Sequence, residues 1–509
     1  MMSYGQNEEL TVEDLSELVA ENSFIGAEPN TAPLPTFAES KERLPQPFWV
    51  GHEDVIDCYY KAWEIAFSNL RQPKKDTGFV SPFIDTAFNG CTFMWDSAFM
   101  LMFGKYADHI FKFQGTLDNF YSHQHRDGFI CREIEEDTGR EHFTRHDPSA
   151  TGPEVLSWCE WTYFENFGDK ERLEKVFAPL MAYHRWMKNH HTWPDGSYFS
   201  SGWGCGMDNC PRLMPCYDQR KSHGHMVWVD VCMQALLDCR CLINMAKVLE
   251  KPEFLPELQE EATYLKKLIN DKLWDENTGF YYDLWKDGGH NMTRHIGAFW
   301  GLLADCIPQD RIAKMAALLE DETEFKTPHR IPTLTQKHPD FVADGRYWRG
   351  GVWASTNYMV LQGLHRKGFD RLAHQIAVEH LQAVVDLYKQ DGTLYECYAP
   401  KSLAPSTTAK GNPVRRDFVG WTGLSPIAVL FESVFGIRAD VPSGIITWDI
   451  RLTEGHGAEN LPFGKDGKVS LRCESRNSEN DRPVIHCTAN VPVKIRVLWG
   501  QDQSFEVAI

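Results

Sequence analysis

The feature that most constrains this chain is a run of apolar residues at helical spacing, which begins at Glu53 and continues, segment after segment, to Phe435. Short Gly, Pro and Asp punctuation separates the segments, as it does between amphipathic helices. The pattern predicts about twelve helices, at residues 53–70, 95–103, 107–123, 153–167, 170–190, 225–249, 256–273, 294–304, 309–319, 352–367, 369–389 and 422–435. Paired helices with short turns fold as a bundle, a solenoid or a closed toroid.

The connections between these helices favour one of the three architectures. No residue-level repeat recurs at a fixed period, which disfavours a solenoid. The longest, most aromatic and most Gly-rich loops follow alternate helices, so they would gather at one end of a ring. We therefore predict a mainly α chain, an (α/α)6 toroid of six helical hairpins with a cleft lined by these loops.

The two ends of the chain differ from the helical part. Residues 1–50 are polar with scattered Pro, which predicts an N-terminal arm that wraps the surface or is partly disordered. After residue 437, short β-branched segments alternate with Gly, Asn and Asp, at 445–452, 468–473, 484–488 and 491–498. The predicted organisation is an arm at 1–50, the toroid at 51–437 and a small antiparallel β domain at 438–509.

The composition restricts the partners of the chain. Lys and Arg number 52 against 71 Asp and Glu, a formal net charge of −19, so nucleic acid and acidic membranes are repelled. No apolar run approaches the roughly 20 residues that span a bilayer. Residues 1–30 lack the pattern of a secretory signal, and the 14 Cys indicate free thiols rather than a disulfide framework. We expect a cytoplasmic chain, or a periplasmic or secreted one if a signal has been removed, with its oligomeric state left open.

Loops that place Trp or Tyr beside a charged group are the main candidates for chemistry. Phosphate-binding, dinucleotide-binding, zinc-peptidase and serine-hydrolase motifs are all missing from the sequence. The aromatic loops lie at residues 93–97, 124–128, 202–212, 347–353, 395–398 and 418–421. A pyranose has apolar faces and a rim of hydroxyls, so its site needs aromatic platforms flanked by carboxylates and guanidinium groups. Trp95 with Asp96, and Trp348 with Arg349, suit such a site.

Residues 201–212 form the most unusual of these loops. Three glycines, Gly202, Gly204 and Gly206, are costly to order, which indicates that the turn aims a functional group. The acid in it is Asp208. Cys205, Cys210 and Cys216 with two following His are residue types that can bind zinc, but their spacing matches no familiar zinc motif, so no metal or other cofactor is expected.

Together these motifs resemble glycoside hydrolase family 63 from roughly residue 53 to 435. They occur in the order that the family shows: Trp95-Asp96-Ser97, 201–212, Trp274-Asp275 with Gly279-Phe280-Tyr281-Tyr282-Asp283, 347–353 with Asn357-Tyr358, Glu396, and 418–421. The family has an α/α toroid and inverts configuration at α-glycosidic bonds. It includes processing and bacterial α-glucosidases and mannosylglycerate hydrolases. Cys210 and Gly351 depart from it, since Ser and Pro are common there.

The resemblance implies Asp208 as general acid and Glu396 as general base. The neighbours usual around the base are lacking here. The substrate-binding set expected from the resemblance and the aromatic loops is Trp95, Asp96, Gln124, Trp203, Arg349, Trp353 and Trp421.

The substrate is expected to be a small carbohydrate. A short α-glucoside is favoured because the sequence shows no cationic cluster for a charged aglycone. The alternatives are mannosylglycerate, glucosylglycerate or a trehalase-like substrate. In other classes, a sugar isomerase or epimerase would use His residues such as His146, His223 and His295, and a carbohydrate-binding protein would bind glycans without turnover.

Overall fold

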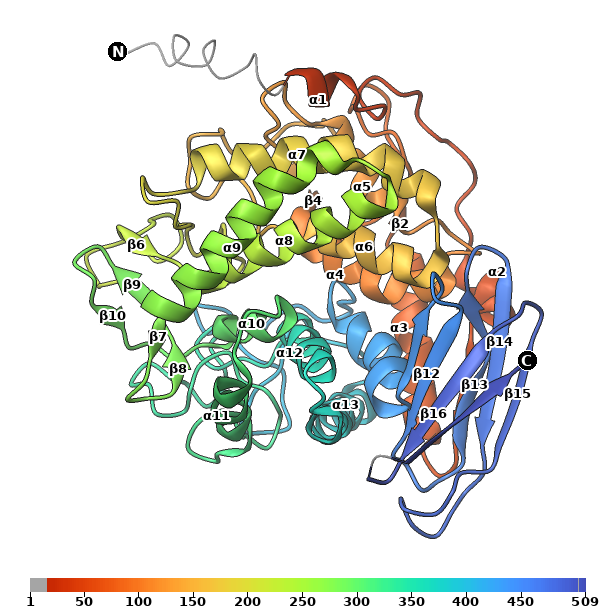
Figure 1. Cartoon of the computed structure of the whole chain (residues 1–509). Helices are drawn as coiled ribbons and strands as arrows, with labels where there is room; N and C mark the ends of the chain where they lie inside the picture. Colours follow the sequence, from red (N-terminus) through yellow and green to blue (C-terminus); the bar gives the residue numbers. More distant parts are fainter. Residues whose placement is uncertain (1–15, 502) are drawn as a thin grey trace.

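A computed structural model describes residues 16–501 and 503–509 of the chain (Figure 1). The body is an (α/α)6 toroid, and two β-sheets lie against one side of it. The fold class predicted from helical periodicity is therefore confirmed. The first fifteen residues of the predicted arm lie outside the described residues. Within 16–501 and 503–509, no helix combines the length and the apolar character needed to cross a membrane.

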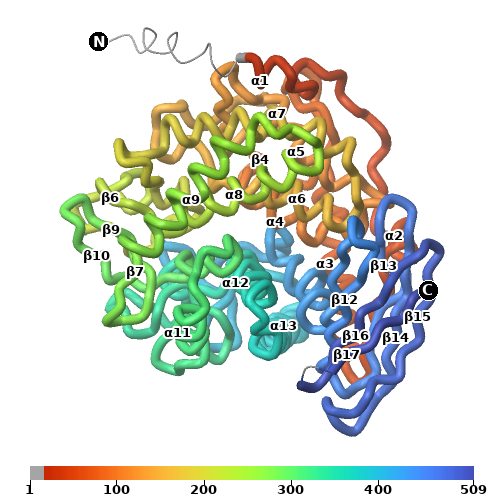
Figure 2. The backbone as a smooth tube through the Cα atoms, in the orientation of Figure 1, coloured from red at the N-terminus to blue at the C-terminus, as the bar shows by residue number. Residues whose placement is uncertain are grey.

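Alternate helices form an inner ring. Its members are α4 (Met94–Gly104), α6 (Leu156–Phe167), α8 (Val229–Val248), α10 (Trp300–Leu303), α12 (Ala354–Arg366) and the π-helix η6 (Ser425–Val434). Each of them contacts the next directly or through the short turns η4 (Ile296–Phe299) and η5 (Thr422–Leu424), and η6 returns to α4. Figure 2 shows this closure, where the blue end of the helical part lies between α3 and α4. Every residue of α4 and η6 is buried, as expected for helices enclosed on all sides.

The intervening helices form the outer layer and bury one face each. They are α3 (Glu53–Ser68), α5 (Gly115–Ser122), α7 (Lys170–His190), α9 (Leu255–Lys272), α11 (Gln309–Glu320) and α13 (Asp370–Asp391). Local sequence sets their ends: the Asp169 carboxylate accepts from the Arg172 amide at the start of α7, and Gly392, with φ +71°, ends α13.

The helix expected at 107–123 is shorter than predicted. Its first residue is the last of a 3-10 turn, η2 (Lys105–Ala107), and the segment becomes α-helical only at α5. Phe111 and Phe113 are both buried and their rings meet at 4.9 Å, while the Lys112 side chain between them is 70% exposed. Residues 108–114 therefore form turns and a bend instead of a continuous helix.

The C-terminal part consists of two four-stranded sheets, with orders β1-β13-β14-β15 and β11-β12-β16-β17. The strands are β1 (Gln46–Trp49), β11 (Ile437–Asp440), β12 (Ile445–Ile450), β13 (His456–Phe463), β14 (Gly467–Cys473), β15 (Ile485–Ala489), β16 (Lys494–Trp499) and β17 (Gln503–Ala508). Their ladders are antiparallel except for the parallel pair β12 and β16. β1 comes from the predicted arm, which also contains α1 (Ser16–Ala20), α2 (Phe37–Ser40) and the turn η1 (Lys41–Arg43).

The loops of the toroid contain short β-hairpins and β-ladders. They are formed by β2 (Leu70–Arg71) with β3 (Phe83–Ile84), β4 (Cys91–Phe93) with β5 (Glu133–Glu135), β7 (Trp274–Asp275) with β8 (Phe280–Tyr281), and β6 (Met226–Val227) with β9 (Asp283–Trp285) and β10 (His290–Asn291). The pair β4 and β5 matters most for function, because α4 begins directly after β4 and carries two of the predicted site residues.

Candidate active site

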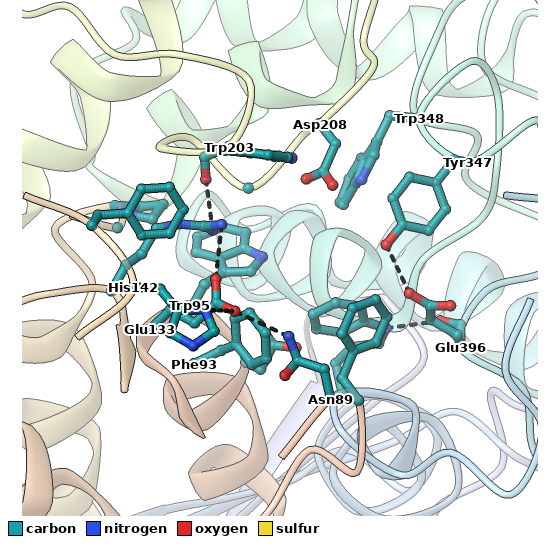
Figure 3. A pocket seen from close by; sticks show the side chains of 18 of the residues that line it. Asn89, Phe93, Trp95, Glu133, His142, Trp203, Asp208, Tyr347, Trp348 and Glu396 are labelled. Carbon is teal, nitrogen blue, oxygen red and sulfur yellow. Dashed lines mark hydrogen bonds and ion pairs between the residues drawn. The ribbon is translucent and has the colours of Figure 1, made fainter. Parts of the chain in front are cut away.

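Five of the six aromatic loops, all except 124–128, contribute residues to the wall of a cavity of about 490 Å³ (Figure 3). It brings together six of the predicted site residues, Trp95, Asp96, Trp203, Asp208, Glu396 and Trp421. The other lining residues are Phe88, Asn89, Phe93, Arg132, Glu133, His142, Phe143, Gly152, Pro153, Gly206, Lys221, Tyr347 and Trp348. Residues spread over more than three hundred positions of sequence therefore line one opening, which has the size and the aromatic lining of a small-ligand site.

The glycines of the 201–212 loop are required by close approaches. Gly206 has φ +78°, and a Cβ atom there would lie 2.9 Å from the indole nitrogen of Trp95. A Cβ at Gly202 would lie 2.2 Å from the carbonyl oxygen of Gln219. Neither position can take a larger residue without movement of the loop, so these glycines let it pass close to Trp95 and hold Asp208 at the cavity.

Arg212 anchors the end of this loop. Its guanidinium group donates to both Asp230 and Asp283, with distances from 2.6 to 2.9 Å, and lies 4.0 Å from the ring centroid of Trp228. All three charged side chains are buried. The bidentate geometry satisfies charges that would otherwise be costly to remove from water. The Asp208 loop is thereby fixed to α8 and β9.

Asn209 joins the Asp208 loop to the loop that carries Tyr347. Its side-chain amide donates to the Arg346 carbonyl at 3.0 Å, and its oxygen accepts from the Trp348 amide at 2.9 Å. The Tyr347 hydroxyl in turn donates to Oε1 of Glu396 at 2.8 Å (Figure 3). The loops of the two predicted catalytic acids are therefore connected through one chain of hydrogen bonds.

Burial raises the pKa of both acids. The pKa of Asp208 is raised to about 6, mainly by burial, while the positive charge of Arg132 acts in the opposite direction. The pKa of Glu396 is raised to about 7 by burial, although the hydrogen bond from Tyr347 favours its charged form, and the charge of Asp208 adds to the increase. In the free site Asp208 thus loses its proton before Glu396, so the order of the two values alone does not identify the acid.

Asp96 is a third buried carboxyl group at the cavity. Burial, and next the negative charge of Glu396, raise its pKa well above the usual range, although Arg132 opposes this. Asp96 does not cap α4, whose N-cap residue is Phe93 and has no side-chain cap bond. It lies in the first turn of the helix, where it faces the cavity and can both donate to and accept from a sugar hydroxyl.

Three cations surround Trp203. The distances to its ring centroid are 5.2 Å from Arg220, 5.4 Å from Lys221 and 5.8 Å from Arg132. Arg132 and Lys221 also line the cavity. Local sequence does not reveal this cluster. Arg132 precedes β5, whereas Arg220 and Lys221 follow the Gly-rich loop, and only folding brings the three side chains together. The wall of the cavity therefore carries two cations that no local sequence pattern reveals.

Three predicted substrate-binding residues do not line the cavity. The Gln124 amide donates to the carbonyl oxygens of Gly128 and Pro179, at 3.1 and 2.8 Å, and is buried. Trp353 is fully buried and stacks behind Trp348, with ring centroids 4.1 Å apart. Gln124 is therefore used in bonds within the protein, and Trp353 supports the cavity wall from behind Trp348.

Arg349, the third, is directed outward. Its guanidinium group lies 3.4 Å from the Asp340 carboxylate, and its side chain is 34% exposed. Sequence placed it beside Trp348, but adjacent residues in a tight loop point in different directions. Trp348 faces the cavity instead.

The groups of side chains that could hold a metal do not include the cysteines of the 201–212 loop. The 14 cysteines are free thiols. The groups that the described residues offer to a metal are Cys91 with Glu133 and His142, His184 with Cys239 and Glu261, and Glu154 with His184 and Asp238. Cys205 and Cys210 belong to none of these groups. Both are buried in the core, and burial raises the pKa of the Cys210 thiol to about 12.

Comparisons with known proteins identify the family of this chain. Residues 91–413 match the family described as the mannosylglycerate hydrolase MGH1-like glycoside hydrolase domain. A mannosylglycerate hydrolase of Thermus thermophilus is 25% identical over 359 residues, which are 57% of this chain and 85% of that enzyme. A probable mannosyl-oligosaccharide glucosidase of Schizosaccharomyces pombe is 26% identical over 288 residues, 53% of this chain and 33% of the yeast protein. The crystal structure of a GH63 mannosylglycerate hydrolase from Thermus thermophilus in complex with glucose superposes with a TM-score of 0.58 at 23% sequence identity. The match covers 72% of this chain and 99% of the chain in that crystal structure.

Proposed function

The chain belongs to the MGH1-like glycoside hydrolase family, within glycoside hydrolase family 63, and on that premise we propose that it cleaves a short α-glycoside with inversion of configuration. The observation that carries the proposal is the convergence of Asp208, Glu396 and Asp96 in one aromatic cavity. Glycosidic hydrolysis needs two carboxyl groups in different protonation states. Aromatic faces beside them suit the apolar faces of a pyranose.

In the proposed reaction Asp208 is the general acid and Glu396 the general base. Glu396 takes a proton from a water molecule, whose oxygen bonds to the anomeric carbon from the face opposite the aglycone. The bond from that carbon to the glycosidic oxygen breaks at the same time, and Asp208 gives its proton to the departing oxygen. Tyr347 stabilises the ionised form of Glu396 through its hydrogen bond.

The surroundings of each acid support this division of roles. Glu396 lies beside Tyr347, and its backbone oxygen accepts from the Trp421 indole at 2.8 Å, which fixes the segment. Asp208 lies on the side of the cavity that Trp203, Arg132 and Lys221 line. The acid must reach the oxygen of the leaving group, so the residues around Asp208 are those that an aglycone would meet.

A neutral α-glucoside is the first candidate substrate. The cations in the cavity wall favour a second candidate, an α-glycoside whose aglycone carries a carboxylate. Arg132 and Lys221 line the cavity on the side of Asp208, where they could pair with a carboxylate in the aglycone. Mannosylglycerate and glucosylglycerate are α-glycosides of this kind. A trehalase-like substrate carries no carboxylate that could pair with these cations.

The remaining partner assignments rest on composition. A net charge of −19 disfavours nucleic acid and acidic membranes as partners. Fourteen free thiols favour a reducing compartment, so we place the protein in the cytoplasm.

A substrate panel tests the proposal. The wild-type enzyme is incubated with maltose, trehalose, glucosylglycerate and mannosylglycerate, and free sugar is measured. We expect turnover of at least one, and loss of that turnover in Asp208→Asn. Activity that survives in Asp208→Asn would instead favour an isomerase or epimerase, and binding of these sugars without turnover would indicate a carbohydrate-binding protein.

Lys221→Ala separates the two substrate candidates. If the aglycone carries a carboxylate, KM for the glycerate compounds should rise about tenfold, because one charge-assisted contact is lost. KM for a neutral α-glucoside should stay within about twofold. Equal effects on both substrates would refute a charge-specific role for Lys221.

A further inference from the structure

A second group of titratable side chains lies inside the helical body, away from the reacting carboxyls. It contains Glu154, in the segment before α6, His184 on α7, Asp238 on α8 and Glu261 on α9. All four side chains are at most 5% exposed. The helices that carry the last three pack against one another in sequence order (Figure 1). A buried cluster of this composition needs either protons or a cation to balance its charge.

Glu154 is the unexplained member of this cluster. Its side chain is fully buried, yet neither carboxyl oxygen has a hydrogen-bond partner among the described residues. Its Oε1 lies 3.9 Å from Nδ1 of His184. The same nitrogen lies 2.9 Å from Oδ2 of Asp238. The two acids therefore approach one ring nitrogen.

This arrangement has the geometry of a metal centre. Ligand atoms from Glu154, His184 and Asp238 all lie within 4.8 Å of one another. Donors about 2.1 Å from one ion are separated by up to about 4.2 Å, so small side-chain shifts complete a set of ligands. The other ring nitrogen, Nε2, faces Glu261 at 3.5 Å. A carboxylate behind a ligating His is the usual second-layer partner of a metal, because it orients the ring.

The residues around Glu261 complete the arrangement. It accepts from Tyr198 and pairs with the Lys188 ammonium at 2.7 Å, so its charge is balanced without the ion. A divalent cation would then neutralise Glu154 and Asp238. Lys188 and Glu261 also line a hollow that is open to solvent, so the cluster lies next to the surface on the side of Glu261.

From this geometry we propose that Glu154, His184 and Asp238 bind one divalent metal ion, with Glu261 orienting the imidazole. One His with two carboxylates suits Zn²⁺, which takes nitrogen and oxygen ligands in small coordination numbers. The site is structural. Glu154 directly follows Gly152 and Pro153 of the cavity wall, so the ion ties this wall to α7 and α8.

The two other ligand sets found among the described residues are weaker candidates. Cys239 with His184 and Glu261 would use a carboxylate that Lys188 already neutralises. Glu133, in the set with Cys91 and His142, accepts from Asn89 at 3.0 Å and from Arg132 at 3.3 Å, so a guanidinium charge already lies beside it.

The first test is the metal content of the full-length protein, purified without a metal-affinity step. We expect about one zinc per chain by mass spectrometry, a lower Tm after treatment with dipicolinate and dialysis, and recovery of Tm with ZnCl2. Absence of metal from the purified protein, together with no uptake of ZnCl2, MnCl2 or CaCl2, would overturn the site. Uptake of manganese or calcium in preference to zinc would contradict the choice of ion.

Variants then locate the ion. Glu154→Gln keeps the shape of the side chain and removes its charge, and we expect zinc affinity to fall more than about 100-fold, because loss of a second-layer partner alone costs about 10- to 100-fold. In Glu261→Gln we expect the zinc affinity to fall only by about 10- to 100-fold. Cys91→Ser and Cys239→Ser are matched controls that should retain one zinc. If Glu154 is a protonated acid and no metal binds, Glu154→Gln leaves Tm unchanged or raises it, and that result would refute the proposal. If Glu154→Gln does not fold, the wild-type metal content and its recovery with ZnCl2 still decide the matter.

Discussion

Replacing Tyr347 by Phe removes one hydrogen bond and keeps the aromatic ring in place. The lost bond is the one from the hydroxyl group to Oε1 of Glu396, at 2.8 Å. A hydrogen bond to a charged group contributes about 1.5–3 kcal/mol, and about 1.4 kcal/mol corresponds to one pKa unit. The pKa of Glu396, about 7 in the wild type, should therefore rise by about one to two units.

The consequence for catalysis follows from the order of the two pKa values. The active form has its proton on Asp208, with a pKa of about 6, and an ionised Glu396, with a pKa of about 7. Because the proton prefers Glu396 by about one pKa unit, the active form is about one tenth as populated as the form with the proton on Glu396. Raising the pKa of Glu396 in Tyr347→Phe makes the active form rarer still, by a further factor of about 10 to 100.

The assay is kcat/KM as a function of pH, which reports the ionisations of the free enzyme. The wild type should give a narrow bell with its maximum between the two pKa values. In Tyr347→Phe the plateau should fall about 10- to 100-fold, while the alkaline limb moves up by one to two units and the acid limb stays near pH 6. Tyr395→Phe is the matched control, because that hydroxyl donates to Asp391 at 2.9 Å instead. If the alkaline limb of the kcat/KM profile moves to higher pH while the maximal kcat/KM does not fall, the reasoning is refuted. That result would mean that the active form has its proton on Glu396, so that Glu396 is the acid.

Two further substitutions test how the 201–212 loop is held. In Gly206→Ala the new Cβ meets the Trp95 indole at a positive φ, so we expect kcat/KM to fall about tenfold or more and the free energy of unfolding to fall by about 1–2 kcal/mol, measured by steady-state kinetics and urea denaturation. Unchanged activity would show that the loop moves freely. In Arg212→Met, Asp230 and Asp283 lose their buried cation, and the free energy of unfolding should fall by about 3–5 kcal/mol. A loss below about 1 kcal/mol would show that the ion pairs contribute little.

The helical body was predictable because its information is local. Apolar spacing reports which face of a helix is buried, and this holds for helices such as α3, α9 and α13, whose predicted ranges nearly coincide with the observed ones. The prediction from apolar spacing is wrong between residues 108 and 114, where two buried Phe flank an exposed Lys. The spacing predicts an ordinary helix at 422–435, where the structure has the π-helix η6, because apolar spacing does not distinguish the hydrogen-bond patterns of the two helix types.

The candidate site was predictable only in part, for a related reason. Gly, Trp and acid residues mark a loop as functional, and this located Asp208 and Trp203. Sequence does not say which way a side chain turns, so Gln124 was assigned to sugar although its amide bonds within the protein. The cations around Trp203 come from separate loops, and no local pattern joins Arg132 to Lys221.

The stereochemistry of the first product tests the central claim most directly. Proton NMR of a fresh reaction of the wild-type enzyme on an α-glycoside resolves the anomeric proton of the released sugar before mutarotation. Single displacement by water predicts that the β-anomer appears first and the α-anomer grows in later. Initial release of the α-anomer would mean retention, and would contradict the roles proposed for Asp208 and Glu396.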